Sequence, residues 1–163
     1  MTLVLNRVDD RLIHGQVVVG WGQPFDIGFI VLVNDEVIQS KSEQELYRMG
    51  TPPEMDVYFH AVDDAVPALP RYREDIRNGI LLTEDVGSMR RLVAEAGVRE
   101  VNIGGIHHRP DRRQRLRYVF LSPAEEEVLR AMERDGATVT ARDVPAANAV
   151  DLRSLLAAEE TGR

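Results

Sequence analysis

The sequence contains no cysteine, and this absence excludes disulfide bonds, thiol catalysis and metal sites built on thiolates. It also suits a reducing compartment such as the cytosol. No apolar run approaches the roughly 20 residues that a membrane-spanning helix needs. Strand-like sequence begins directly after Met1, so we expect neither a membrane span nor a signal peptide.

Positive charge is also in deficit, because 27 acidic residues face 20 basic ones and the formal net charge is −7. A chain of this charge is not expected to bind nucleic acid or an anionic membrane surface as a whole. The exception is the segment from Arg109 to Arg117, which holds five arginines and one aspartate. We interpret it either as a docking surface for an acidic partner or as a solvated loop.

Short apolar runs alternate along the chain with longer amphipathic stretches. The runs predict strands near residues 3–8, 27–33, 56–59, 80–83, 98–103 and 137–141. The stretches predict helices over 35–49, over 84–96 and after a capping box that starts at Ser122. Residues 61–78 are a weaker candidate, since two prolines interrupt them.

This alternation of strands and helices predicts the fold class. A length of 163 residues fits one ordinary domain. We therefore expect a single α/β domain over residues 1–163, with an open, mainly parallel β-sheet and helices on both faces. Residues 158–163 are expected to form a frayed tail.

The first loop, from Asp9 to His14, carries the strongest candidate site. In open α/β sheets, ligands bind beyond the carboxyl ends of the strands, and this loop follows the first strand. His14 and Gly15 stand where a helix is expected to begin, and helix starts attract anions. Arg11 adds a planar donor group suited to phosphate oxygens, and Asp9 or Asp10 could orient the ring or hold the arginine.

These parts fit a histidine that accepts a phosphoryl group or meets an anionic substrate. From the residues alone, simple helix capping with a surface ion pair remains an open alternative. The glycine patterns of P-loops and of dinucleotide-binding folds are absent from this loop. A second pair of histidines, His107 and His108, follows Gly104 and Gly105. We expect that segment to border the site and do not expect a metal centre there.

The segment from residue 7 to residue 21, R-V-D-D-R-L-I-H-G-Q-V-V-V-G-W, resembles the signature of the IIB component of the sugar phosphotransferase system (PTS), mannose/fructose/sorbose class. Further resemblances follow in order along the chain, at residues 30–37, 81–86, 101–106 and 144–152. The resemblance covers essentially the whole sequence. It implies a single α/β domain with a mainly parallel sheet.

The resemblance also implies a phosphocarrier, a transferase whose acceptor is His14, with Nδ1 as the phosphorylated nitrogen. Arg11 would neutralise phosphoryl charge, and we expect Asp10 to orient the ring. Gly15 and Thr83 are the expected phosphate-binding residues. No metal and no cofactor is implied.

The partners implied by the resemblance are a IIA protein that donates the phosphoryl group, a sugar that receives it, and the membrane components IIC and IID that carry the sugar. The protein would then be cytoplasmic and held at the inner face of the membrane through IIC and IID. The sequence leaves open a homodimer, a regulatory phosphohistidine module without a role in sugar transport, and an anion-binding module without a covalent step. It predicts no nucleic-acid partner.

Overall fold

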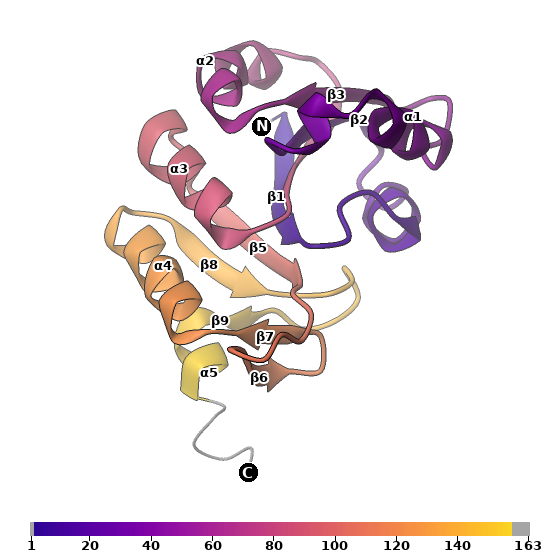
Figure 1. Ribbon diagram of the computed structural model, residues 1–163. Coiled ribbons are helices and arrows are strands. Elements are labelled where there is room, and N and C mark those ends of the chain that lie inside the picture. The colour runs from indigo at the N-terminus through magenta and orange to yellow at the C-terminus, as the bar shows by residue number, and fades with distance from the viewer. Residues whose placement is uncertain (1, 158–163) are drawn as a thin grey trace.

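The computed structural model describes residues 2–157 and is built around a seven-stranded sheet with helices on both faces (Figure 1). The strand order is β3-β2-β4-β1-β5-β8-β9, and every neighbouring pair is parallel except β8 and β9. The strands are β1 (Leu3–Asp9), β2 (Ile27–Val33), β3 (Asp56–His60), β4 (Asn78–Thr83), β5 (Glu100–Gly105), β8 (Thr138–Ala141) and β9 (Val150–Asp151). The prediction of a single, mainly parallel α/β domain is confirmed, and the predicted tail lies outside the described residues.

Both faces of the sheet are buried, as a parallel sheet requires. In β2, Phe29 and Val31 point into one core and Ile30 and Leu32 into the other, and all four are fully buried. The first core lies under α2 (Val62–Arg73), α3 (Val86–Ala96), α4 (Pro123–Arg134) and α5 (Leu152–Ala157). The second lies under the short helices η1 (Gln16–Trp21) and η2 (Val37–Gln39).

The predicted helices form with some changes at their ends. The capping box at Ser122 opens α4 as expected, and Gly97, with φ of 72°, ends α3. The stretch 35–49 divides into η2 and α1 (Lys41–Met49), because Ser40 caps the second helix through its side chain. Helix α2 runs through two prolines because it buries an apolar stripe against the sheet. Within residues 2–157, no helix is long and apolar enough to cross a membrane.

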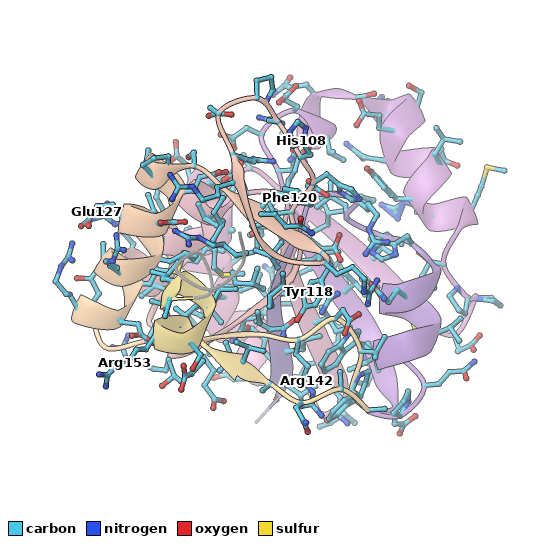
Figure 2. The ribbon with its side chains drawn as sticks, turned by 90° about the horizontal axis from the view of Figure 1, so that it is seen from below. His108, Tyr118, Phe120, Glu127, Arg142 and Arg153 are labelled. Atoms are coloured by element: carbon cyan, nitrogen blue, oxygen red, sulfur yellow. The ribbon has the colours of Figure 1, made fainter. Side chains whose placement is uncertain are left out.

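The arginine-rich segment is a loop over residues 109–112 and then enters a β-hairpin, which the sequence did not suggest. Its strands are β6 (Arg113–Leu116) and β7 (Val119–Leu121), packed beside α4 and α5 (Figure 2). Arg112 makes two hydrogen bonds to Glu125, at 2.9 and 2.7 Å, and the buried Arg115 pairs with Glu126 at 2.5 Å. These two arginines fasten the hairpin to α4. The docking-surface interpretation therefore does not hold for them.

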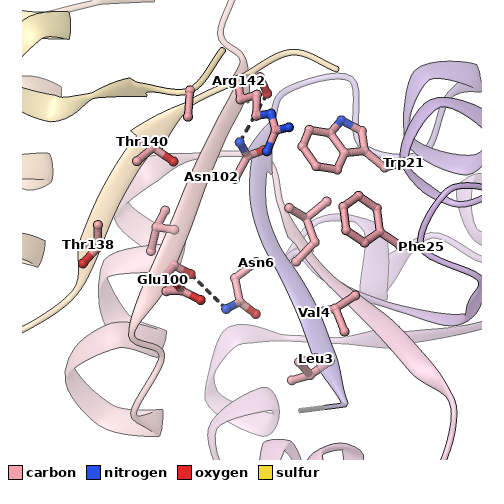
Figure 3. Close-up of a pocket in the computed structure, with 13 residues that line it drawn as sticks. Leu3, Val4, Asn6, Trp21, Phe25, Glu100, Asn102, Thr138, Thr140 and Arg142 are labelled. Carbon is pink, nitrogen blue, oxygen red and sulfur yellow. Dashed lines mark hydrogen bonds between the residues drawn. The ribbon is translucent and has the colours of Figure 1, made fainter. Parts of the chain in front are cut away.

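Beyond η1, part of the second face of the sheet is left uncovered. A hollow of about 480 Å³ lies there, between β1, β5, β8 and the side chains of Trp21 and Phe25 (Figure 3). Its sheet wall carries polar side chains, among them Asn6, Thr138 and Thr140. Thr138 is exposed and Thr140 is partly exposed there, so this part of the sheet face is not wholly apolar.

Candidate functional site

The site lies at the carboxyl end of β1, the central strand. The chain leaves β1 towards β2 on one side, whereas the neighbouring β5 leads on towards β8 on the other. Such a change of direction opens a crevice between two strand ends. The loops that follow β1 and β5 meet in it, because the backbone N–H of Asp10 donates to the carbonyl of Gly105 at 2.9 Å.

The carboxylate of Asp9 is the centre of the site. It is fully buried and accepts hydrogen bonds from Arg7 at 3.1 Å, from Arg11 at 3.3 Å and from His14 at 3.1 Å. Burial alone would raise the pKa of Asp9. The hydrogen bond from His14, the charge of Arg7 and the hydrogen bond from Arg11 outweigh burial and lower this pKa to about 2. Asp9 is therefore a permanent anion in the physiological range.

The contact with Asp9 determines which nitrogen of His14 is available. An ionised carboxylate only accepts hydrogen bonds, so the ring nitrogen facing it, Nε2, must carry the hydrogen. In the neutral ring, the lone pair then belongs to Nδ1. Within residues 2–157, no hydrogen-bond partner occupies Nδ1, and the side chain is 18% exposed. The ring is thus fixed in the tautomer whose Nδ1 is nucleophilic.

A buried arginine holds Asp9 in turn. Arg7 is fully buried, and its guanidinium also donates to Asn102 at 2.6 Å and to the carbonyls of Arg142 and Asp143 at 3.0 and 3.1 Å. The ring of Trp21 lies 5.3 Å from the guanidinium, and its Nε1 donates to the Asp143 carbonyl. Figure 3 shows Trp21 beside Arg142 and Asn102. Arg7 is therefore held by partners of its own besides Asp9.

The two adjacent glycines at the end of β5 make room for these side chains. A methyl group at Gly104 would overlap the guanidinium of Arg7, and one at Gly105 would come within 3.3 Å of both Arg11 and Asp9. The Gly-Gly pair therefore has a steric reason, which is the close approach of β5 to the charged groups of β1.

We expect Gly104→Ala to lower the free energy of unfolding by about 2–3 kcal/mol, because a methyl group there must displace a buried ion pair. The matched control is Gly87→Ala in the exposed first turn of α3, where an added methyl group meets only Asp85, at 3.5 Å. Denaturant unfolding of both variants measures the difference. Equal stabilities would show that β5 can move away from Arg7 at no cost.

Arg11 is the exposed cation of the site. Its side chain is 41% exposed, and its guanidinium contacts Asp9 and, through Nη2 at 2.8 Å, the side chain of Gln16. The remaining nitrogen, Nη1, has no hydrogen-bond partner within residues 2–157. A charged donor thus stands beside His14 with hydrogen-bonding capacity left for an anion.

The structure differs from the expectation for Asp10. It is Asp9 that contacts the ring of His14, whereas the carboxylate of Asp10 accepts from the backbone N–H and faces the ring Nδ1 of His107. Consecutive residues at the end of a strand point to opposite sides. Their order in the sequence does not say which of the two faces a given partner.

Thr83 is not in place to bind phosphate in this structure. The residue is fully buried, and its hydroxyl donates to the backbone carbonyl of Asp85, at the start of α3. Hydroxyl side chains often turn back to nearby backbone in this way. Gly15, by contrast, borders open space, since an added methyl group would meet nothing within 4 Å.

The helix expected after His14 is a six-residue π-helix that begins at Gln16. So short a helix contributes little partial positive charge at its N-terminus. The positive charge available to an anion at this place is therefore mainly that of Arg11. Arg7 and Asn102 were not among the predicted site residues. The available signal was a lone arginine inside the apolar strand 3–8. Within residues 2–157, no group of three or more histidine or acidic side chains could hold a metal ion.

Comparison with known proteins shows the family of the chain. Residues 3–163 match the family model described as the sorbose subfamily IIB component of the PTS system. The chain is 31% identical over 157 residues to the sorbose-specific EIIB component of Klebsiella pneumoniae, with 93% of this chain and 94% of that protein covered. It is 32% identical over 150 residues to the mannose-specific EIIAB component of Escherichia coli (strain K12), covering 88% of this chain and 45% of that protein.

The fold comparison gives the same result. The crystal structure of the IIBSor domain of the sorbose permease from Klebsiella pneumoniae superposes with a TM-score of 0.87 and 28% sequence identity. The match covers 99% of this chain and 98% of the crystallised chain. The likeness therefore extends over the whole described fold, the loop of Asp9 and His14 included.

Proposed function

The chain belongs to the IIB components of the sorbose subfamily of the sugar phosphotransferase system, and on this premise we propose that His14 is its phosphoryl acceptor. Members of this family take part in phosphotransfer during sugar uptake. The observation that carries the proposal is the hydrogen bond between Nε2 of His14 and Asp9, because it leaves Nδ1 free as the nucleophile.

In the loading step, Nδ1 of His14 attacks the phosphorus of a phosphohistidine on a IIA protein. A P–N bond forms at His14 while the donor's P–N bond breaks, and that electron pair returns to the donor ring. The ring of His14 keeps its hydrogen on Nε2 and so becomes cationic, which the buried anion of Asp9 stabilises. Arg11 offsets the charge on the phosphoryl oxygens.

In the outgoing step, a sugar hydroxyl attacks the same phosphorus and the P–Nδ1 bond breaks. A cationic ring is a better leaving group than a neutral one, so the hydrogen held between Nε2 and Asp9 supports this step as well. The open space at Gly15 leaves room for the reacting partner to approach. No step requires a metal ion or a cofactor.

The partners we propose are a IIA protein as donor and the membrane components IIC and IID, which would present the sugar. The Escherichia coli relative is named the mannose-specific EIIAB component, a name that combines IIA with IIB. This combination supports a IIA protein as the partner. With such partners the protein would work in the cytoplasm, at the inner face of the membrane.

The test is phosphoryl transfer from a phosphorylated IIA protein, followed by the intact mass of the product. We expect one phosphate per chain that is labile in acid and stable in base. If a donor that is active on another IIB protein gives no adduct here, the phosphocarrier proposal is wrong. The interpretation that then remains is a module that binds anions without a covalent step. An adduct that never passes to any sugar would favour the regulatory module.

We expect Arg11→Gln to slow loading by roughly 100-fold, because one charged donor to the transferred group is lost. The fold should survive, since the side chain is partly exposed. The matched control is Arg90→Gln on α3, an exposed arginine outside the site. Single-turnover loading rates measure the effect. Equal rates for both variants would remove Arg11 from the mechanism.

A further inference from the structure

The end of β1 holds two histidines and not one. Asp9 binds Nε2 of His14 at 3.1 Å, and the next residue, Asp10, faces Nδ1 of His107 at 2.5 Å. The second pair is fixed further by the backbone, because the N–H of His107 donates to the other oxygen of Asp10 at 2.7 Å. The phosphocarrier mechanism uses the first pair and gives the second no role.

The orientation of His107 is the reverse of that of His14. A carboxylate accepts, so Nδ1 of His107 carries the hydrogen, and the lone pair of the neutral ring is on Nε2. Within residues 2–157, no side chain or backbone group binds this Nε2, and the side chain is 64% exposed. A carboxylate that fixes the hydrogen-bearing nitrogen of a histidine is the arrangement that prepares the opposite nitrogen to take a proton.

His107 also lies beside the transfer site. It lines a small polar pocket of about 200 Å³ together with Arg11, Gln16 and Arg117. Arg11 contacts the Asp9 carboxylate that binds His14, so the pocket and the acceptor ring lie on neighbouring sides of one guanidinium. Arg11 is therefore the group that the pocket and the acceptor site share.

The two half-reactions differ in their need for a base. Loading moves a phosphoryl group between two imidazole rings and releases no hydroxyl proton. The outgoing step joins the phosphoryl group to a sugar oxygen, so the hydroxyl proton must leave. Nε2 of His14 already carries a hydrogen, and Nδ1 is bonded to phosphorus until the group has left. Asp9 already accepts hydrogen bonds from Arg7, Arg11 and His14.

We propose that His107 is the general base of the outgoing step, an inference that rests on the proposed function of His14. As the sugar oxygen bonds to phosphorus, its proton passes to Nε2 of His107. The P–Nδ1 bond of His14 breaks and its electron pair returns to the ring of His14. Asp10 then stabilises the cationic ring of His107, which gives its proton to water before the next cycle.

The experiment separates loading from discharge. Wild type and His107→Gln are loaded from a phosphorylated IIA protein and then mixed with membrane vesicles that carry the IIC and IID components. The probe sugars are sorbose, fructose, mannose and N-acetylgalactosamine, for which relatives of the chain are named. We expect His107→Gln to load and to discharge to the accepted sugar at least about tenfold more slowly.

Two further variants keep a structural role apart from a chemical one. His108→Gln is the matched control, since His108 is the adjacent exposed histidine, packs edge-on against Phe120 and does not line the pocket. It should discharge like wild type. His107→Ala should discharge slowly and recover when free imidazole is added, because imidazole can replace a missing base at an exposed position.

The outcomes distinguish the two proposals. A wild type that never loads overturns the function proposed for His14. Loaded His107→Gln that discharges at the wild-type rate overturns only the general base, and so does slow discharge of His107→Ala that imidazole does not restore. A wild type that loads and passes its group to none of the sugars also overturns the base, because no hydroxyl then reacts.

Discussion

Replacing His14 with alanine is expected to abolish phosphorylation while leaving the fold intact. The ring supplies the reacting nitrogen, and its contact with Asp9 places the lone pair on Nδ1. The loss should be complete within detection, in contrast to the partial loss expected for Arg11→Gln. The measurement is the intact mass after incubation with a phosphorylated IIA protein, with circular dichroism to confirm folding.

The control for this loss is His108→Ala, which removes an exposed histidine of the hairpin region and should load like wild type. An acid-labile phosphate on His14→Ala would contradict the assignment of the acceptor. Mapping that phosphate would then show which of the remaining histidines receives it. Equal loading of both variants would place the acceptor at neither His14 nor His108.

Replacing Asp9 with asparagine should cause the largest loss of stability among single substitutions in the site. Asparagine has nearly the same shape but no charge, so the fully buried guanidinium of Arg7 loses its counter-ion. Leaving a buried charge uncompensated costs about 3–5 kcal/mol. For a chain of this length, a fall in Tm of roughly 10 °C follows. The control is Asp63→Asn, whose side chain is 83% exposed and pairs with Arg91 on the surface.

The same substitution should change how stability depends on pH. The pKa of Asp9 is lowered to about 2 in the folded protein, so its contribution is complete above the unfolded pKa near 4 and is lost as pH falls towards 2. That contribution is roughly 2 kcal/mol, from a lowering of nearly two pKa units. Asp9→Asn should lack this loss. The free energy of unfolding, measured between pH 5 and pH 2, tests this expectation. Parallel curves of that free energy against pH for variant and wild type would contradict it.

The strands were predictable because a strand that is buried on both faces of a sheet has a continuous run of apolar residues. The run from Ile27 to Val33 is apolar throughout, since its side chains alternate between two cores. The first strand of the hairpin β6–β7 has no such apolar run. This strand is rich in arginine, because Arg115 reaches an acidic partner on α4 that lies 11 residues further along the chain. Charge compensation across elements cannot be read from one segment.

The place of the candidate site was predictable from the sequence, but the contacts among its residues were not. The positions of His14 and Arg11 follow from the loop after the first strand, which any open α/β sheet exposes. The choice between Asp9 and Asp10 depends on how the strand ends, and the pairing of β1 with β5 shifts its register between Val8 and Asp9. Sequence spacing does not reveal such a shift. The partner of Asp10, His107, lies on a different strand end altogether.

The distant partners of Arg7 have a consequence for the order of events during synthesis. Its guanidinium is satisfied by groups 95, 135 and 136 residues away along the chain. A nascent chain that has not yet reached Arg142 lacks two of these acceptors, so Arg7 cannot be buried with all its bonds. Contacts so far apart in sequence form late in folding. We therefore expect His14, the proposed acceptor, to be synthesised near the beginning and to reach its folded site only near the end.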